Sequence, residues 1–185
     1  MPLRILKLPR AWWLAMLLVM GAYASARAPA HAAEGATFIV VRHAEQVVDD
    51  SRDPPLSKRG VARAKALARR LAGAPLVAAY ATPLRRTRQT AQPAAARHRI
   101  AITSYDATMP PADFVAGLRA RHVRGTVLVV GHSNTVPEIV AGLCSCRIRA
   151  LGEEDYDAIY TIRIGRDGHG VLDVGRQSED STTRP

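Results

Sequence analysis

Two apolar runs of the same kind constrain the fold of this chain more than any other feature. Residues 37–41 (TFIVV) and 126–130 (TVLVV) contain mostly β-branched and aromatic side chains, with no alternation of polar and apolar positions. This pattern is typical of strands that are buried on both faces, and such strands occur mainly in parallel sheets covered by helices. The two runs therefore predict an α/β fold with a mostly parallel central sheet.

Segments with helical patterns separate these strands, as an α/β fold requires. Ser57 is an expected N-cap of the first helix, where Val61, Ala64 and Leu67 recur at helical spacing and Gly73 ends the pattern. Further elements are expected in the following order: a strand at 76–81, a helix capped by Thr82 that runs towards Pro93 or Ala96, a short strand near 100–103, helices at 112–122 and 136–143, and an edge hairpin with strands at 158–162 and 171–174.

The first 32 residues have the layout of a secretory signal peptide. Three basic residues precede an uncharged, mainly apolar run at 11–24, and the small residues that follow offer cleavage sites after Ala26, Ala30 and, with the best fit, Ala32. The alternative is an uncleaved membrane anchor, but the run is shorter than the roughly 18 to 20 residues that a spanning helix needs. We therefore expect a signal peptide at 1–32, a domain at 33–175 and a disordered tail at 176–185. The protein is then periplasmic or secreted, without stable membrane insertion.

The charge after residue 32 favours anionic partners. All 16 acidic residues and 22 of the 26 Lys and Arg residues follow residue 27, which leaves a formal charge of +6. A positive surface attracts anions such as phosphorylated substrates. No basic run is interleaved with aromatic residues that could stack on bases, so nucleic acid is not an expected partner.

The two cysteines, Cys144 and Cys146, are separated by one residue. A bridge between them closes a very small ring, so we expect either a labile disulfide or two thiols. No histidine lies near them in the sequence, and no metal site or cofactor is expected.

Polar residues with catalytic potential follow the predicted strands. His43 comes directly after the first apolar run and is preceded by Arg42, while His132 follows the second run. Arg86 lies early in the helix after the strand at 76–81. Ligands of open α/β sheets bind at the carboxyl ends of the strands, so these four side chains are expected in one pocket. Two guanidiniums match phosphate oxygens, one imidazole can attack phosphorus, and the other can stabilise developing charge.

Four motifs at these positions resemble those of the histidine phosphatase superfamily, also called phosphoglycerate mutase-like. Residues 42–45 (RHAE) resemble its Arg-His-Gly/Ala signature, and residues 56–60 (LSKRG) resemble its Leu-Ser/Thr-x-x-Gly segment. Residues 82–91 (TPLRRTRQTA) resemble its Ser-x-Leu-x-Arg-x-x-x-Thr-Ala segment, which selects Arg86 over Arg85. Residues 131–133 (GHS) resemble its second histidine motif.

The resemblance implies a three-layer α/β/α sandwich and a phosphatase of the histidine acid phosphatase type. His43 is then the phosphorylated nucleophile, with Arg42, Arg86 and His132 around the phosphate, and the reaction needs no metal. The substrate is expected to be a small phosphorylated compound.

One role stays open, because larger members place a carboxylic acid near the leaving group. Asp106 is the first candidate, Glu45 and Asp53 are others, and the acid can also be absent. The missing acid leaves a second interpretation, a member of this fold that binds a phosphorylated ligand with little or no turnover. A third, a basic module for anionic surfaces or nucleic acid, leaves the four motifs unexplained.

Overall fold

A six-stranded sheet organises the part of the chain that this computed structural model describes, residues 35–177. These residues all belong to the unit Ala33–Pro185. The elements follow one another as β1 (Ala36–Arg42), α2 (Lys58–Arg70), β2 (Leu76–Ala81), α3 (Arg85–His98), β3 (Ile102–Ser104), α4 (Pro111–Arg121), β4 (Gly125–Gly131), α5 (Thr135–Cys144), β5 (Ala158–Ile164) and β6 (Gly170–Arg176). The predicted signal peptide at 1–32 and residues 178–185 of the predicted tail lie outside the described residues.

The strand order is β3-β2-β4-β1-β5-β6. The strands β3, β2, β4 and β1 pair in parallel, whereas β5 is antiparallel to β1 and β6 is antiparallel to β5. The two predicted apolar runs form β1 and β4, which lie side by side in the middle of the sheet. The carboxyl ends of β1, β2 and β4 therefore meet at one edge of the sheet, and the chain enters β5 at that same edge.

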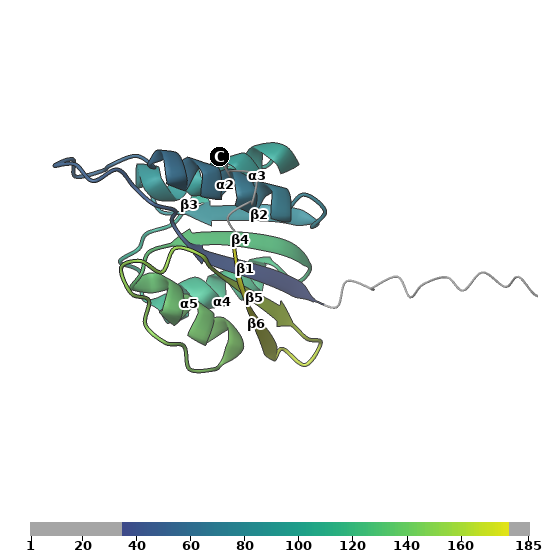
Figure 1. Cartoon of the computed structure of the whole chain (residues 1–185). Helices are drawn as coiled ribbons and strands as arrows, with labels where there is room; N and C mark the ends of the chain where they lie inside the picture. Colours follow the sequence, from purple (N-terminus) through teal and green to yellow (C-terminus); the bar gives the residue numbers. More distant parts are fainter. Residues whose placement is uncertain (1–34, 178–185) are drawn as a thin grey trace, which may run out of the picture. The chain divides into compact units, whose positions relative to one another are not determined.

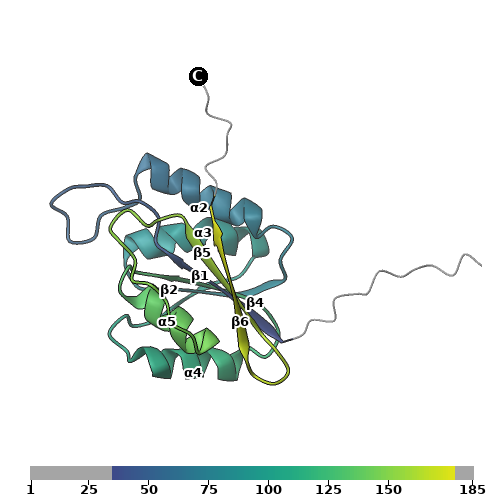
Figure 2. The ribbon, with the colours of Figure 1, turned by 60° about the horizontal axis from the view of Figure 1, so that its bottom comes forward.

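Helices cover both faces of the sheet, with α2 and α3 on one side and α4 and α5 on the other (Figures 1 and 2). Alternate residues of β1 point to opposite faces of the sheet and pack against the two helix layers, as the two-residue period of a strand requires. Phe38 and Val40 belong to the core cluster that includes residues of α4 and α5, and Ile39 and Val41 belong to the cluster that includes residues of α2 and α3. The predicted three-layer α/β/α architecture with a mostly parallel sheet is confirmed.

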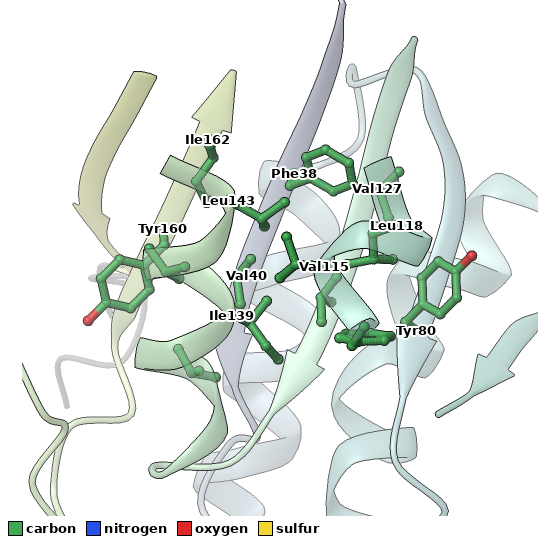
Figure 3. Packing of buried hydrophobic residues seen from close by; sticks show 14 of the residues in the cluster. Phe38, Val40, Tyr80, Val115, Leu118, Val127, Ile139, Leu143, Tyr160 and Ile162 are labelled. Atoms are coloured by element: carbon green, nitrogen blue, oxygen red, sulfur yellow. The ribbon is translucent and has the colours of Figure 1, made fainter. Parts of the chain in front are cut away.

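The layer under α4 and α5 is built mainly from aliphatic side chains. Figure 3 shows Val115 and Leu118 of α4 and Ile139 and Leu143 of α5 directed towards the sheet. Leu118, Leu143 and their partners Phe38 and Val127 have no exposed surface. This packing holds β1 and β4 rigidly, and these are the strands that end in the two histidines.

Three details of the predicted helices differ from the structure. Val61 is 41% exposed, and Arg63 is buried instead because its guanidinium pairs with Glu45. Leu84, rather than Thr82, is the N-cap of α3, because the Thr82 hydroxyl bonds to side chains at the strand end. Helix α3 continues through Pro93 to His98, although an interior proline removes one hydrogen bond and crowds the carbonyl four residues earlier, because the buried Ala91, Ala94 and Ala95 pack this part of the helix against the core.

The chain end that the structure describes is also ordered further than the expected boundary at 175. Strand β6 reaches Arg176, and Gln177 is buried, with its backbone N–H donating to the carbonyl of Asp157. Among residues 35–177, no helix is long and apolar enough to cross a membrane.

Candidate active site

The register of the two central strands brings the two predicted histidines together. Arg42 of β1 is level with Gly131 of β4, and the backbone N–H of His43 donates to the Gly131 carbonyl at 2.9 Å. The next residue of each strand end is therefore a histidine, and both side chains leave the same edge of the sheet. The imidazole rings of His43 and His132 lie edge to face, 5.5 Å apart between centroids.

A backbone hydrogen bond fixes which nitrogen of His43 can act as a nucleophile. The Nδ1 atom lies 2.8 Å from the carbonyl oxygen of Ala44. A carbonyl only accepts, so in the neutral ring Nδ1 carries the hydrogen and Nε2 carries the lone pair. His43 is only 5% exposed, which keeps this orientation fixed.

Two threonine hydroxyls set the protonation of His132. The single hydrogen of the Thr87 hydroxyl has the backbone carbonyls of Thr82 and Leu84 as acceptors. With this hydrogen on a carbonyl, the Thr87 oxygen accepts from the Thr82 hydroxyl at 2.8 Å. The single hydrogen of Thr82 is then used, and its oxygen can only accept from His132 Nε2, 3.1 Å away. His132 therefore carries a hydrogen on Nε2, and any further proton must bind to Nδ1.

Arg42 and Arg86 supply positive charge to the site, and neither pairs with a carboxylate of residues 35–177. Arg42 is 9% exposed, and within this range its side chain donates to the backbone carbonyls of Gly152 and Glu153. The Nε atoms of both arginines are buried and have no acceptor among the described residues. Buried polar atoms almost always have a hydrogen-bond partner, so the Nε atoms of buried Arg42 and half-buried Arg86 are available to an external anion.

Helix α3 positions Arg86 against the turn at residues 43–45, which follows β1. The Thr90 hydroxyl donates to the carbonyl of Arg86 and accepts the backbone N–H of Ala44, the residue that follows His43. One threonine thus joins the first turn of α3 to the end of β1. This contact gives a physical reason for the spacing of the third motif.

Burial, with help from the nearby cations, keeps both imidazoles neutral. Burial is the main reason that the pKa of His43 is lowered from 6.5 to about 4. The Ala44 hydrogen bond raises this pKa, while His132, Arg42 and Arg86 lower it. Burial and the charges of Arg86 and Arg42 also lower the pKa of His132 to about 4. At neutral pH, His43 is therefore the neutral ring that nucleophilic attack requires.

The three candidate acids all have other partners. Asp106 is exposed beyond the edge strand β3, and its carboxylate accepts from the backbone N–H and hydroxyl of Thr108, each at 2.8 Å. Burial opposes ionisation of Glu45, but the hydrogen bonds and charge of Arg63 hold its pKa below the ordinary value. Asp53 accepts the backbone N–H of Arg85 at 2.9 Å. The structure brings the predicted nucleophile His43 together with the three predicted phosphate ligands Arg42, Arg86 and His132, whereas each of the three acids is hydrogen-bonded elsewhere.

Two features of the site were missed in the sequence. The segment that precedes β5 contacts Arg42, and Tyr156 of this segment lies 6.0 Å from the His43 ring between centroids. The available signal was the predicted edge hairpin: a strand antiparallel to β1 must begin where β1 ends. Upstream of this segment, Cys144 and Cys146 form a disulfide, one of the two states expected for them. Within residues 35–177, no group of three or more His, Cys, Asp or Glu side chains could hold a metal ion.

The fold and the site together define an α/β protein with two histidines and two arginines at the carboxyl ends of its parallel strands. Residues 38–108 match the model of the histidine phosphatase superfamily, branch 1. This segment contains Arg42, His43 and Arg86, whereas His132 lies beyond it. Residues 38–108 are therefore similar to this superfamily in sequence, and the rest of the chain is compared with known proteins through its fold.

Solved structures with phosphoglycerate mutase-like folds resemble the chain over most of their own length. The protein histidine phosphatase SixA, complexed with tungstate, is 19% identical with a TM-score of 0.61, covering 76% of this chain and 97% of its own. Phosphoserine phosphatase from Entamoeba histolytica is 18% identical with a TM-score of 0.59, covering 78% and 98%. A mycobacterial glucosyl-3-phosphoglycerate phosphatase is 16% identical with a TM-score of 0.62, covering 78% and 100%. No curated protein matches the sequence.

Proposed function

We propose that the protein hydrolyses phosphomonoesters through a phosphohistidine formed on Nε2 of His43, without a metal ion. The phosphatase-type function is supported by the superfamily match and by the structural neighbours, whose names describe phosphatases. The observation that carries the proposal is the combination of a neutral, oriented His43 with Arg42 and Arg86, whose buried Nε atoms have no acceptor among residues 35–177.

The reaction has two steps. The lone pair of His43 Nε2 forms a bond to phosphorus, the ester P–O bond breaks, and the leaving oxygen departs with the electron pair and takes a proton from water. Water then attacks phosphorus, the P–N bond breaks, and Nε2 recovers its lone pair while inorganic phosphate forms. Arg42, Arg86 and a His132 protonated on Nδ1 stabilise the charge on the phosphoryl oxygens, which is the main requirement of phosphoryl transfer.

The direct test is hydrolysis of a chromogenic aryl phosphate by the purified protein and by His43→Ala. We expect turnover that persists in the presence of a chelator and that the substitution abolishes. A brief reaction with substrate labelled in its phosphoryl group, stopped in base, should leave label on His43, because the proposed phosphohistidine forms on its Nε2 atom. Turnover that continues without a labelled adduct on His43 would refute this mechanism.

A second function is favoured by the positions of the acidic residues. Asp106, Glu45 and Asp53 all have other hydrogen-bond partners, so none of these three carboxyl groups is free to protonate a leaving group. A poor leaving group then departs slowly, and the protein acts on such esters mainly as a phospho-ligand-binding member of the fold.

Leaving-group dependence separates these two functions. We expect good hydrolysis of aryl phosphates and slow hydrolysis of alkyl phosphates, since an aryl oxide departs without a proton donor. Asp106→Asn should change the rates on both substrates by less than about twofold, because surface substitutions outside a site have small effects. A selective loss on the alkyl phosphate would instead assign Asp106 as the general acid.

We also propose that this activity is located outside the cytoplasm. The support is the basic, apolar and small-residue layout of residues 1–32. N-terminal sequencing of protein recovered from the extracytoplasmic fraction tests it. Recovery only from the cytoplasm, with Met1 retained, would contradict export.

A further inference from the structure

The segment that leads into β5 closes one side of the site. It runs from Gly152 to Tyr156 and is called the 152–156 segment below. Both hydrogens of Arg42 Nη1 have acceptors in this segment, the carbonyl oxygens of Gly152 at 2.8 Å and of Glu153 at 2.7 Å. These are the only side-chain hydrogen bonds that Arg42 makes with residues 35–177.

This arrangement determines which edge of the Arg42 guanidinium can bind an anion. A guanidinium has five N–H donors and binds phosphate best through two parallel donors on one edge. Because both Nη1 hydrogens are used, the edge formed by Nη1 and Nη2 is blocked. The edge formed by Nε and Nη2 keeps its donors, and Nε is buried without an acceptor among the described residues.

The ring of Tyr156 fixes the plane of the same guanidinium. The Arg42 Cζ atom lies 4.0 Å from the centroid of the Tyr156 ring, which is the geometry of a cation–π contact. Tyr156 also faces the nucleophile, at 6.0 Å between its ring centroid and that of His43. One aromatic ring therefore contacts both the cation and the imidazole of the site.

The 152–156 segment is itself held in place by Asp155. The Asp155 carboxylate accepts the backbone N–H of Gly152 at 2.8 Å and pairs with Arg149 at 3.0 Å. This hydrogen bond from Gly152 holds the pKa of Asp155 below its ordinary value. The carbonyl that orients Arg42 and the amide that Asp155 binds belong to the same residue, so the two contacts are coupled.

From these contacts we propose that the 152–156 segment is a functional part of the phosphate site and that Tyr156 is a positioning residue. The ring and the two carbonyls hold Arg42 so that its Nε–Nη2 edge binds the phosphoryl group. This role rests on the proposed function, because it assumes that the anion at Arg42 is the phosphoryl group of the substrate. It adds a fourth segment to the site, in a part of the chain that none of the four motifs covers.

The test measures binding of inorganic phosphate to the full-length protein by titration calorimetry, so that it does not depend on turnover. Tyr156→Leu removes the aromatic face, and we expect phosphate to bind about fivefold to thirtyfold more weakly, the range of a partly to fully desolvated cation–π contact. Tyr156→Phe keeps the ring and should restore binding to within about twofold. Asp155→Ala, which frees the Gly152 amide, should weaken binding in the same direction without touching the ring.

A double-mutant cycle shows whether Tyr156 acts through Arg42. In an Arg42→Lys background no planar fork is left to orient, so Tyr156→Leu should have no further effect on phosphate binding. The matched control is Arg86→Lys, in which the effect of Tyr156→Leu should persist in full. Equal losses in the two backgrounds, or a Tyr156→Leu protein that binds phosphate as well as the parent, would overturn the proposal. Absence of hydrolysis and of a His43 adduct would refute the proposed function but would leave this binding result unchanged.

Discussion

At the scale of single residues, the site depends on hydrogen bonds whose direction is fixed by valence. His43 donates from Nδ1 to a carbonyl, and His132 donates from Nε2 into the chain formed by the Thr82 and Thr87 hydroxyls. Each ring is thereby prepared for a different task. His43 offers a lone pair to phosphorus, whereas His132 can take up a proton on Nδ1 and become a charged donor when an anion arrives.

Replacing Thr82 tests this division of roles. In the free site the pKa of His132 is about 4, so this ring is neutral at pH 5.5. A bound anion favours its protonated form. Binding of sulfate at pH 5.5 should therefore be accompanied by the uptake of about one proton at most. In Thr82→Val the imidazolium loses its acceptor, and we expect less proton uptake and about tenfold weaker binding, in line with a lost charged hydrogen bond. Calorimetry in buffers with different ionisation enthalpies measures both quantities.

Thr82→Ser is the control, since it keeps the hydroxyl and should preserve the uptake. Sulfate is the suitable probe because it gains no proton itself in this pH range. If Thr82→Val took up as many protons as the parent protein, the Thr82 hydroxyl would have no part in the protonation of His132.

At the scale of elements, the junction between β1 and α2 determines the position of His43. The Glu45 carbonyl accepts the backbone N–H of Ser57, and the Glu45 carboxylate pairs with Arg63 of α2. Gly60 allows this close approach, because a Cβ atom at position 60 would lie 2.0 Å from the Glu45 oxygen. Gly60, the glycine of the second motif, is therefore required because it packs against the turn at residues 43–45.

Gly60→Ala should consequently affect both stability and catalysis. We expect a loss of about 2–3 kcal/mol in the free energy of unfolding, as for overpacking at a rigid contact, together with a fall in kcat because the turn at 43–45 must shift. Gly73→Ala is a matched control, as nothing lies within 4 Å of its added Cβ. Denaturant unfolding and aryl phosphate kinetics on both variants measure the difference, and equal behaviour of the two would contradict the packing argument.

The same junction shows how far the sequence could predict the structure. The strands β1 and β4 follow from uninterrupted apolar runs, and the placement of both histidines follows from their position after those runs. The burial of Arg63 in place of Val61 could not be predicted from helical spacing, because it depends on Glu45, a residue of another element. The contact of Tyr156 with Arg42 likewise depends on the antiparallel pairing of β5 with β1, which spacing along the chain does not specify.

At the scale of the whole molecule, the positively charged Arg42 and Arg86 lie at the ends of the strands that form the middle of the core. The two central strands, covered on both faces, end in His43 and His132, and Arg42 and Arg86 lie beside them. No acid of the described residues pairs with these two arginines, so the site is prepared for an anion at a cost to the stability of the free protein. Phosphate should therefore raise the melting temperature, because a ligand that binds only the folded state stabilises it.

That cost should appear in the dependence of stability on pH. Because the folded-state pKa of His43 is about 4 and the unfolded value is 6.5, the unfolded chain binds this proton more readily. Stability is then unaffected above pH 6.5 and decreases as the pH falls from 6.5 to 4, by about 3 kcal/mol for His43. The acids Glu45 and Asp155 have lowered pKa values in the folded protein, so the stability that they contribute is lost at more acidic pH.

Urea unfolding at several pH values should show a smaller decrease in stability between pH 6.5 and 4 in His43→Asn. His169→Asn, which removes an exposed histidine, should show the same decrease as the parent protein. An unchanged decrease in His43→Asn would mean that the buried imidazole does not resist protonation, and the neutral nucleophile would lose its physical basis.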